Sequence, residues 1–550
     1  MNIHALLVNR FTEALQEMGV ENAPVPVSRS ARPEFGEYQF NGAMALAKQL
    51  KQKPRDIAEK IVETVKLDDI ASKLEVAGPG FINVHLNDAW LSNQCELSLT
   101  DPRLGIAKSP EQNIVVDYSS PNLAKEMHVG HLRTTIIGDA VVKVLEFLGH
   151  NVIRQNHMGD WGTQFGMLLA HLSDKLQEEV AETALSDLED FYREAKVRFD
   201  EEEGFADRAR EYVVKLQGGD AQCLALWEKF IDVSIAHSEE VYDKLNVSLT
   251  RKDIMGESAY NEDLANVISD LKAKGIAVED QGAQVVFIPE LADKEGNPAV
   301  YIVQKSGGGY LYATTDLAAM RYRSGKLNAD RTLILTDARQ ALHFKQTEIV
   351  GRKAGFMKEE QTYEHCPFGM MLGSDGKPFK TRTGGTVKLV ELLDEAVERA
   401  GKLIAERDND LSEEELKEVA RKVGIGAVKY ADLSKNRTTD YMFNWDSMLS
   451  FEGNTAPYLQ YAYTRVKSLF RKAGVDMATM PVDITIVEKQ EHALAVLLMQ
   501  FEEVIGLVSR EATPHVLCTY LYDVASAFMT FYEACPMLKE GIEPQVRDSR

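Results

Sequence analysis

Apolar residues in the middle of the chain alternate between short unbroken runs and longer stretches with helical spacing. A β-branched run at 114–116 ends in turn-forming residues at 119–122, and helical spacing then continues over 130–148 before a second apolar run at 152–153. This order predicts a strand, a loop, a helix and a strand. Because the alternation continues over 106–390, the sequence predicts a Rossmann-like, doubly wound parallel sheet there.

The regions on either side of this sheet have different patterns. Residues 1–105 combine three helical stretches with a hairpin around Gly78-Pro79-Gly80, which predicts a separate α+β domain. Within the sheet region, an acidic stretch at about 171–245 predicts a helical insertion. Over 395–550 the strand pattern ends and amphipathic helices follow one another, which predicts an α-helical bundle. The predicted fold class is therefore multidomain α/β, with the parallel sheet between an α+β domain and a helical bundle.

Length and composition are ordinary for a globular protein of several domains. A chain of 550 residues exceeds one hydrophobic core, so roughly three or four domains are expected. The five cysteines form no C-x-x-C pair, which argues against a structural zinc or a disulfide framework. Apolar runs are shorter than a membrane span, and the first residues do not resemble a secretory signal. We therefore expect a cytoplasmic protein without a membrane partner.

The loop between the first strand and its helix carries the strongest candidate chemistry. His128, Gly130 and His131 stand where the positive end of the helix faces the crevice beyond the strand ends, so the loop is placed to bind a polyphosphate. Two imidazoles there can donate hydrogen bonds to phosphoryl oxygens, Gly130 lets a ligand lie against the backbone, and Lys125 adds a positive charge. His-x-Gly-His arises by chance in about two chains per hundred of this composition, but its position at a strand-to-helix junction favours a function.

The stretch SSPNLAKEMHVGHLRTT at 119–135 resembles the His-Ile-Gly-His region of class I aminoacyl-tRNA synthetases, and specifically that of the arginyl enzymes. The resemblance extends along nearly the whole chain, including FGEYQFNGAMALAKQL at 35–50. It implies that 1–105 is an additional domain that contacts the outer corner of a tRNA, for which a packing or dimerisation module is the alternative. The catalytic residues that it implies are Lys125, His128, Gly130 and His131.

Six polar residues are candidates for an arginine site. A guanidinium has five donors in a rigid fork and prefers carboxylates that grip it in pairs, and a tyrosine can close over its plane. Tyr312 and Asp316 are four apart and share a face if their segment is helical, whereas Glu257 lies in a loop. Each carboxylate alone is more often a helix cap or a surface ion pair, so the resemblance carries the assignment. It implies that six residues match the arginine-binding positions of the family: Asp117, Asn122, Glu257, Tyr312, Asp316 and Gln340.

A Gly- and Lys-rich loop, GSDGKPFKTRTGG at 373–385, follows the last predicted strand, and its alternative interpretation is a solvated turn. In most class I synthetases a Lys-Met-Ser-Lys-Ser loop here steadies the pyrophosphate. This loop lacks the Lys-Met-Ser-Lys-Ser sequence, and in that respect it resembles the loop of arginyl enzymes. In those enzymes a lysine before the His-x-Gly-His element compensates for the missing loop lysine, and Lys125 occupies that place here. Mg²⁺ is expected with the ATP, without a dedicated metal site. The ATP-binding residues that the resemblance implies are Ser119, His128, Gly130, His131, Lys377, Lys380 and Arg382.

The predicted helical bundle mixes aromatic and basic residues over 443–472. Exposed aromatics beside basic residues suit splayed RNA bases, although most of these aromatics should be core by default. The net charge of −23 does not oppose this interpretation, because clustered carboxylates at 178–203 and 408–418 leave basic patches elsewhere intact. The stretch resembles the anticodon-binding bundle of arginyl-tRNA synthetases. The tRNA-binding residues that this implies are Asn454, Tyr458, Gln460, Tyr461 and Arg465.

The last long helical stretch carries an apolar face that one neighbouring helix can hardly cover. Its members are Val516, Leu517, Tyr520, Leu521, Val524, Phe528 and Phe531. Enzymes of the family that the chain resembles usually continue with one more amphipathic helix past the position of Arg550. The sequence therefore predicts a bundle that lacks a last helix and has an exposed apolar groove.

The expected function is that of an arginine–tRNA ligase, which activates L-arginine with ATP to arginyl-adenylate and transfers arginine to the 3′ end of its tRNA. The expected partners are an arginine-accepting tRNA, L-arginine and ATP, and the protein is expected to be a monomer. Two alternatives remain. A small-molecule nucleotidyltransferase can share such a sheet but needs neither flanking domain. A catalytically inactive RNA-binding paralogue can keep both flanking domains but is expected to lose the histidines or the acidic pocket.

Overall fold

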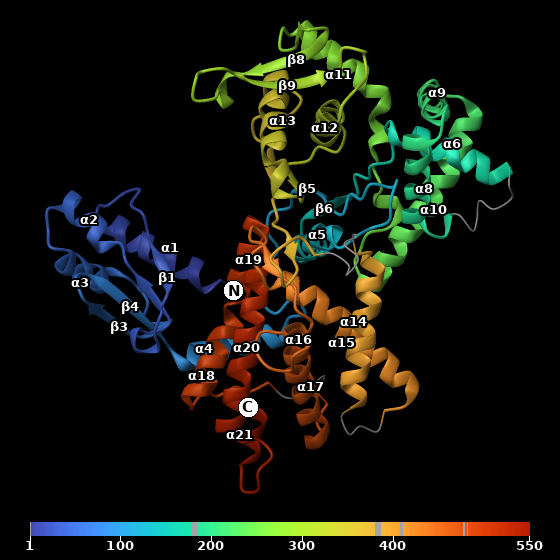
Figure 1. The fold of residues 1–550 in the computed structure, drawn as a ribbon. Coiled ribbons are helices and arrows are strands. Elements are labelled where there is room, and N and C mark those ends of the chain that lie inside the picture. The colour runs from blue at the N-terminus through green and yellow to red at the C-terminus, as the bar shows by residue number, and fades with distance from the viewer. Residues whose placement is uncertain (1, 178–184, 380–386, 407–410, 477–478, 481) are drawn as a thin grey trace. The chain divides into compact units, whose positions relative to one another are not determined.

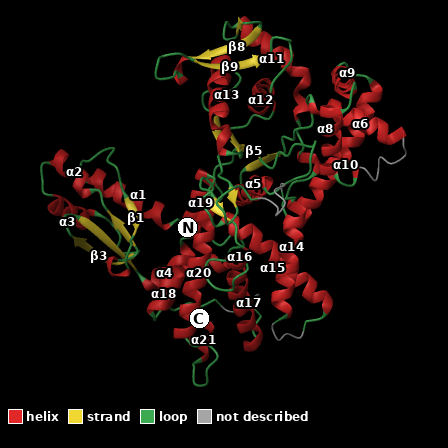
Figure 2. Cartoon of the chain, viewed as in Figure 1, coloured by secondary structure: helices red, strands yellow, loops and turns green. Residues whose placement is uncertain are grey.

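The computed structural model describes the chain except residues 1, 178–184, 380–386, 407–410, 477–478 and 481. Its elements, labelled in Figure 1 and coloured by type in Figure 2, fall into two compact units. The terminal unit comprises Met1–Lys108, Phe451–Asn454 and Tyr458–Arg550. The central unit comprises Ser109–Ser450 and Thr455–Pro457.

The central unit is built on a four-stranded parallel sheet with strand order β11-β10-β5-β6, which confirms the predicted sheet type. Its strands are β5 (Asn113–Asp117), β6 (Asn151–Gln155), β10 (Arg331–Ile334) and β11 (Thr362–His365). The connecting helix α5 (Gly130–Phe147) buries its apolar positions, as the helical spacing predicted. Because all four strands are parallel, their carboxyl ends meet at one edge, and the loops that follow β5, β6 and β10 gather there.

Two insertions extend the connection between β6 and β10. The helical insertion begins at Gln164, earlier than the predicted 171. Its helices are α6 (Gln164–Gln177), α8 (Leu188–Glu201), α9 (Phe205–Gln217) and α10 (Ala221–Leu245). An antiparallel sheet that the sequence analysis did not predict follows, formed by β7 (Val278–Asp280), β8 (Ala283–Ile288) and β9 (Ala299–Gln304). This sheet shares one core with α11 (Asn261–Ala273), α12 (Tyr312–Arg321) and α13 (Ala341–Ala354). It therefore supports α12, which carries the candidate arginine-binding residues Tyr312 and Asp316, and α13, whose N-cap is Gln340.

The central unit continues past residue 395, where the sequence predicted a division. Helices α14 (Leu389–Ala405) and α15 (Glu413–Leu433) pack together in this unit, and α16 (Trp445–Met448) follows. Strand β13 (Tyr441–Met442) pairs in parallel with β12 (Met371–Leu372). The expectation that strands end before 395 is therefore wrong. Its cause is the length of β13, because a strand of two residues shows no alternating pattern.

A buried ion pair joins α5 to α15. Arg133 is 1% exposed, and its Nε lies 3.1 Å from Oδ2 of the fully buried Asp432. Its Nη1 donates to the backbone oxygen of Thr439 at 2.9 Å, and its guanidinium lies over the ring of Tyr441, 5.2 Å from the centroid. Buried charges need partners of this kind, since an unpaired one is costly to remove from water. Helix α5, whose first turn contains His131, is thereby tied to α15.

The amino-terminal part of the terminal unit is the predicted α+β domain. Its antiparallel sheet has the order β1-β2-β4-β3, and the predicted hairpin around Gly78 joins β3 to β4. Phe11 of α1 stacks on Phe40 of β2 in its core, with ring centroids 4.6 Å apart. The elements are α1 (Ile3–Glu17), β1 (Val27–Arg29), β2 (Tyr38–Phe40), α2 (Ala43–Leu50), α3 (Pro54–Thr64), β3 (Ala71–Ala77), β4 (Phe81–Leu86) and α4 (Asp88–Thr100).

Helix α18 (Lys489–Met499) and residues 484–486 before it pack on this domain and share its core. The hydroxyl of Tyr38 donates to Oε1 of Glu503 at 2.6 Å. His492 lies between Asp88 and Glu37, with nitrogen–oxygen distances of 2.6 and 3.0 Å. The carboxyl-terminal helices are α17 (Ala456–Ala473), α18 (Lys489–Met499), α19 (Phe501–Glu511), α20 (His515–Ala534) and α21 (Pro544–Ser549).

Helix α20 lines an open apolar cavity of about 600 Å³, which confirms the predicted groove. Leu521 is 40% exposed there and Phe528 is half-buried. Phe531 lines the cavity although it is buried, whereas Val516, Leu517 and Tyr520 do not line it, so the groove takes only part of the predicted apolar face. Its other walls come from α17 and α18 and from residues near the carboxyl-terminal end of the chain.

Among the described residues, one stretch, Lys489–Glu511, is long and apolar enough to cross a membrane by length and composition alone, and an 18-residue window of it has a mean hydropathy of 1.4. A break at Gln500 divides it into α18 and α19. Both helices pack against α20, and α18 also packs against α4. This is the arrangement of amphipathic helices in a bundle.

Candidate active site

His128 and His131 hold fixed tautomers at the start of α5. Nδ1 of His128 accepts a hydrogen bond from the backbone N–H of Gly130 at 3.0 Å. Nδ1 of His131 accepts one from the backbone N–H of His128 at 3.1 Å. Because Nδ1 is the acceptor in both neutral rings, the proton of each lies on Nε2. The two rings, with centroids 4.1 Å apart, therefore present a pair of Nε2–H donors.

Burial keeps both histidines neutral. It lowers the pKa of His128, to which the charge of Lys125 contributes, and it lowers the pKa of His131 to about 3, with a further contribution from His128. Gly130 is needed for this arrangement, because a Cβ there would lie 2.7 Å from Cε1 of the His128 ring. At neutral pH the pair can stabilise developing negative charge by donating hydrogen bonds without transferring protons.

A cavity of about 220 Å³ adjoins the histidines. Its walls combine aromatic and methionine side chains with the carboxylate of Asp337, which follows β10, a composition that suits a flat heterocycle with polar edges. The lining residues are His128, Val129, Gly130, Arg133, Asp337, Arg339, Phe368, Gly369, Met370, Met371, Pro378 and Phe379. The cavity therefore has a lining that suits a nucleoside, with His128 in one wall.

The basic side chains that are candidates for binding ATP differ in their surroundings. Nζ of Lys125 lies over the ring of Tyr192 on α8, 4.1 Å from its centroid, and is close enough to lower the pKa of His128. Lys377 is exposed in the turn that precedes Pro378. Lys380 and Arg382 lie outside the residues that the structure describes.

Two candidate ligand residues at the end of β5 are engaged inside the protein. Ser119 is 3% exposed, and its hydroxyl lies 2.7 Å from the hydroxyl of Tyr242. Asp117 forms a buried ion pair with Arg323 at 2.7 Å and accepts a hydrogen bond from the hydroxyl of Ser120 at 2.8 Å. Both side chains therefore bond within the protein in this structure. The direct contacts of Ser119 with ATP and of Asp117 with the amino acid stay predictions.

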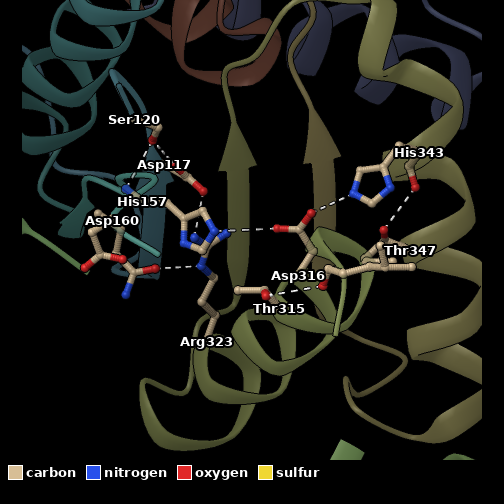
Figure 3. A network of polar contacts seen from close by, with 12 residues as sticks. Asp117, Ser120, His157, Asp160, Thr315, Asp316, Arg323, His343 and Thr347 are labelled. Atoms are coloured by element: carbon tan, nitrogen blue, oxygen red, sulfur yellow. Dashed lines mark hydrogen bonds and ion pairs between the residues drawn. The ribbon is translucent and has the colours of Figure 1, made fainter. Parts of the chain in front are cut away.

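Asp316 lies between two histidines, as Figure 3 shows. Its Oδ2 is 2.6 Å from Nε2 of His343 on α13, and its Oδ1 is 3.8 Å from Nε2 of His157, which follows β6. Tyr312, one turn earlier on α12, is 63% exposed and directs its ring edge-on to His343. Tyr312 and Asp316 therefore share a helix face, as their spacing predicted, and both contact the same imidazole.

Glu257 is a half-buried carboxyl on a turn that Asp160 holds. Asp160 accepts hydrogen bonds from the backbone N–H and the hydroxyl of Ser258, at 2.8 and 2.6 Å. Burial raises the pKa of Glu257 to about 8, and the charges of Asp316 and Asp160 contribute to the rise. Among the residues that the structure describes, no Lys or Arg forms an ion pair with Glu257 or Asp316. These two carboxyl groups therefore lack an ion-pair partner of Lys or Arg among the described residues, and a cationic ligand can take that place.

Asn122 and Gln340 are both exposed. Oδ1 of Asn122 accepts hydrogen bonds from the backbone N–H of Ala124 and from Nε2 of Gln164, each at 3.0 Å. Gln340 precedes α13, one turn before His343. Tyr312 and Asp316 thus contact His343, Gln340 lies at the N-cap of the helix that carries this histidine, and Asn122 belongs to the loop after β5.

Three residues of this site had no role assigned from the sequence: His157, Asp160 and His343. The glycine-rich segment 157–166 indicated a tight loop at the crevice, and His343 stands one helical turn after Gln340. Neither pattern shows which carboxylate or turn the side chain meets, because those partners lie far away in the sequence.

The candidate tRNA residues lie in the terminal unit. The guanidinium of Arg465 lies 5.0 Å from the ring centroids of both Tyr461 and Tyr532, and Tyr461 is 43% exposed. A cation beside an exposed ring is a surface on which a base can stack. The remaining candidates are Asn454, which is exposed, and Tyr458 and Gln460, which are half-buried.

Family models match three successive parts of the chain. The model of the "tRNA synthetases class I (R), catalytic domain" matches residues 95–445, the "Arginyl tRNA synthetase N terminal domain" matches 5–86, and the "DALR anticodon binding domain" matches 459–550. The chain belongs to the class I arginyl-tRNA synthetases. Within this family it is 98% identical over 550 residues to an arginine–tRNA ligase of Alteromonas mediterranea and 77% identical over 552 residues to one of Pseudoalteromonas atlantica. Each alignment covers 100% of this chain and 96% of the relative.

Solved synthetase structures have the same fold. The arginyl-tRNA synthetase of Plasmodium falciparum is 29% identical with a TM-score of 0.86, over 100% of this chain and 94% of that one. The arginyl-tRNA synthetase of Thermus thermophilus is 24% identical with a TM-score of 0.83, over 100% of this chain and 95% of that one. Both likenesses agree with the multidomain α/β fold expected from the sequence.

Proposed function

We propose that this arginyl-tRNA synthetase joins L-arginine to the 3′ end of its tRNA at the expense of ATP. One observation carries the proposal: the central unit combines the Nε2–H donors of His128 and His131 with the carboxyl groups of Glu257 and Asp316. The donors suit the phosphates of a nucleotide, and the carboxyl groups suit a guanidinium. Relatives named arginine–tRNA ligase support the same pairing of substrates.

The first step is an in-line displacement at the α-phosphate of ATP. The carboxylate of arginine attacks, arginyl-adenylate forms and pyrophosphate leaves. His128 and His131 donate hydrogen bonds to the phosphoryl oxygens, and Gly130 leaves room for the phosphate beside the backbone. Lys125, Lys377, Lys380 and Arg382 are the cations available to the departing pyrophosphate. Catalysis then consists mainly of positioning and charge stabilisation.

The amino acid is selected by charge and shape. Glu257 and Asp316 bind the fork of the guanidinium, and Tyr312 closes over its plane. Gln340 borders this pocket, and Asn122 holds the α-substituents of the amino acid. A neutral or shorter side chain would leave the half-buried Glu257 and Asp316 without a cation, which disfavours it by a factor of about 10⁴ or more in sites built on such contacts.

The terminal unit supplies the surfaces that bind the tRNA. In the terminal unit the surface around Tyr461 and Arg465, with Asn454, Tyr458 and Gln460, binds the anticodon, and residues 1–105 contact the outer corner of the tRNA. Mg²⁺ enters with ATP, because this cation is usually bound through substrate phosphates. The enzyme works as a monomer in the cytoplasm.

Pyrophosphate exchange with each of the twenty amino acids, measured with and without tRNA, tests this function. We expect exchange with arginine alone, and only when cognate tRNA is present, as the family resemblance implies. Exchange with another amino acid would contradict the choice of substrate. Loss of exchange in the presence of tRNA, with RNA binding retained, would favour a catalytically inactive RNA-binding protein.

A further inference from the structure

The Asp316 carboxylate accepts a hydrogen bond from one imidazole and lies near a second, and no Lys or Arg of the described residues pairs with it. Oδ2 accepts from Nε2 of His343 at 2.6 Å, and Nε2 of His157 stands 3.8 Å from Oδ1. A carboxylate can only accept, so Nε2 of His343 carries the proton. In its neutral form an imidazole donates this bond without cancelling the negative charge that a guanidinium needs. A lysine or arginine in its place would orient Asp316 equally well and repel the ligand.

His343 is itself held from several directions. Its side chain is 13% exposed, and its ring contacts Tyr312 edge-on with centroids 4.7 Å apart and Phe344 with centroids 5.0 Å apart. The hydroxyl of Thr347 donates to the backbone oxygen of His343 at 3.0 Å and lies 2.7 Å from the hydroxyl of Tyr301. Figure 3 shows this arrangement of His343, Thr347 and Asp316. The imidazole therefore presents Nε2 to Asp316 from a packed position.

A carboxylate that grips a guanidinium in two places must keep its plane fixed, since two parallel hydrogen bonds require aligned groups. The bond from His343 fixes this plane at Oδ2 and leaves the remaining lone pairs of Asp316 for a ligand. The same ring supports the edge of Tyr312, so a single side chain orients both the carboxylate and the tyrosine. Loss of the imidazole donor would therefore loosen two contacts with the amino acid and none with the nucleotide.

We propose that His343 is a positioning residue for arginine, which holds Asp316 and Tyr312 in the orientation that receives the guanidinium. The proposal rests on the arginine pocket put forward above. His343 acts through Asp316, so its influence falls on the Michaelis constant for arginine and leaves that for ATP nearly unchanged.

Two substitutions separate the hydrogen bond from the packing. His343→Leu fills the space without a donor, whereas His343→Gln places an amide nitrogen near the position of Nε2. In aminoacylation by the full-length enzyme with saturating tRNA, we expect His343→Leu to raise the arginine KM about tenfold or more and the ATP KM less than about threefold. His343→Gln should restore the arginine KM to within about threefold of wild type. Equal defects in the two variants would overturn the proposal.

His365→Leu is the matched control. Like His343, His365 contacts Phe344, on which it stacks with centroids 5.0 Å apart, and its Nε2 lies 2.9 Å from the hydroxyl of Thr336. Its substitution removes a similar volume without touching Asp316, and the arginine KM should stay near wild type. If His343→Leu lowers the melting temperature far more than this control, His343→Asn replaces it, because its amide is too short to reach Oδ2.

A double-mutant cycle with Asp316→Ala distinguishes failure of this proposal from failure of the pocket. If Asp316→Ala raises the arginine KM and His343→Leu adds nothing in that background, His343 acts through Asp316 as proposed. If Asp316→Ala raises the arginine KM but His343→Leu in the wild-type background does not, the pocket stands and the positioning role is wrong. If neither variant affects the arginine KM, the proposed arginine pocket itself is wrong.

Discussion

Arginine binding should release a proton from Glu257. A carboxyl group with a pKa of about 8 is protonated in roughly nine of ten molecules at pH 7. A guanidinium binds the carboxylate form, so the empty pocket must lose this proton when arginine enters. The apparent affinity at pH 7 is then about tenfold, or ~1.4 kcal/mol, below its limiting value, and at pH 6 about a hundredfold below it. Because the pKa of Glu257 is raised in the empty pocket, affinity increases as the pH rises and levels off above about pH 8.

The arginine KM in aminoacylation, measured at saturating ATP and tRNA, tests this reasoning. We expect it to fall about 25-fold between pH 6.5 and 8.5, and to stay nearly constant in Glu257→Gln over the same range. The ATP KM in the same assays is the control. Calorimetry in two buffers of different ionisation enthalpy should show about 0.9 proton released per arginine at pH 7. An arginine KM that is equal at both pH values, or that varies as steeply in Glu257→Gln, would refute the reasoning.

Further predictions concern the histidine pair, the buried charges and the terminal unit. His131→Ala should lower the single-turnover rate of adenylate formation by about two to three orders of magnitude with little change in ATP binding, since it removes a donor to the transition state. Glu257→Gln should raise the melting temperature of the arginine-free enzyme at pH 8.5. The raised pKa of Glu257 contributes stability that is fully present below about pH 4.5 and is lost as the pH rises through about 8. Asp432→Ala leaves Arg133 with an unpaired buried charge, and denaturant titration should show a loss of about 3–5 kcal/mol. His492, whose pKa its bond with Glu37 raises to about 8, stabilises the terminal unit below about pH 6.5 and loses this contribution as the pH rises through about 8. His492→Gln should therefore lower the melting temperature at pH 6 and have little effect at pH 9.

Periodicity was sufficient for the elements that repeat a pattern over many residues. Helix α5 and the hairpin of β3 and β4 formed where apolar spacing and turn residues predicted them. The pair of β12 and β13 escaped prediction because each strand has two residues, and its pairing partner lies about seventy residues away in the chain. The sheet of β7, β8 and β9 escaped because exposed apolar side chains such as Phe287 and Ile302 obscure its alternation.

The sequence located the segments of the candidate site, but it did not predict which side chains contact one another there. The His-x-Gly-His stretch and the spacing of Tyr312 and Asp316 identified loops and a helix face. The contact of Asp117 with the ligand stays a prediction, and the sequence contains no sign that Arg323, far along the chain, pairs with its carboxylate. The role of His343 depends on the packing of α13 against α12. Such long-range pairs follow from the tertiary fold and leave no signature in one sequence.

The central claim is that Glu257 and Asp316 select arginine by its guanidinium. A crystal structure of the full-length enzyme with bound L-arginine tests this most directly. The account predicts guanidinium nitrogens within hydrogen-bond distance of both carboxylates, the ring of Tyr312 over the guanidinium plane, and His343 still bonded to Asp316. An arginine whose guanidinium lies elsewhere, with both carboxylates unengaged, would contradict it.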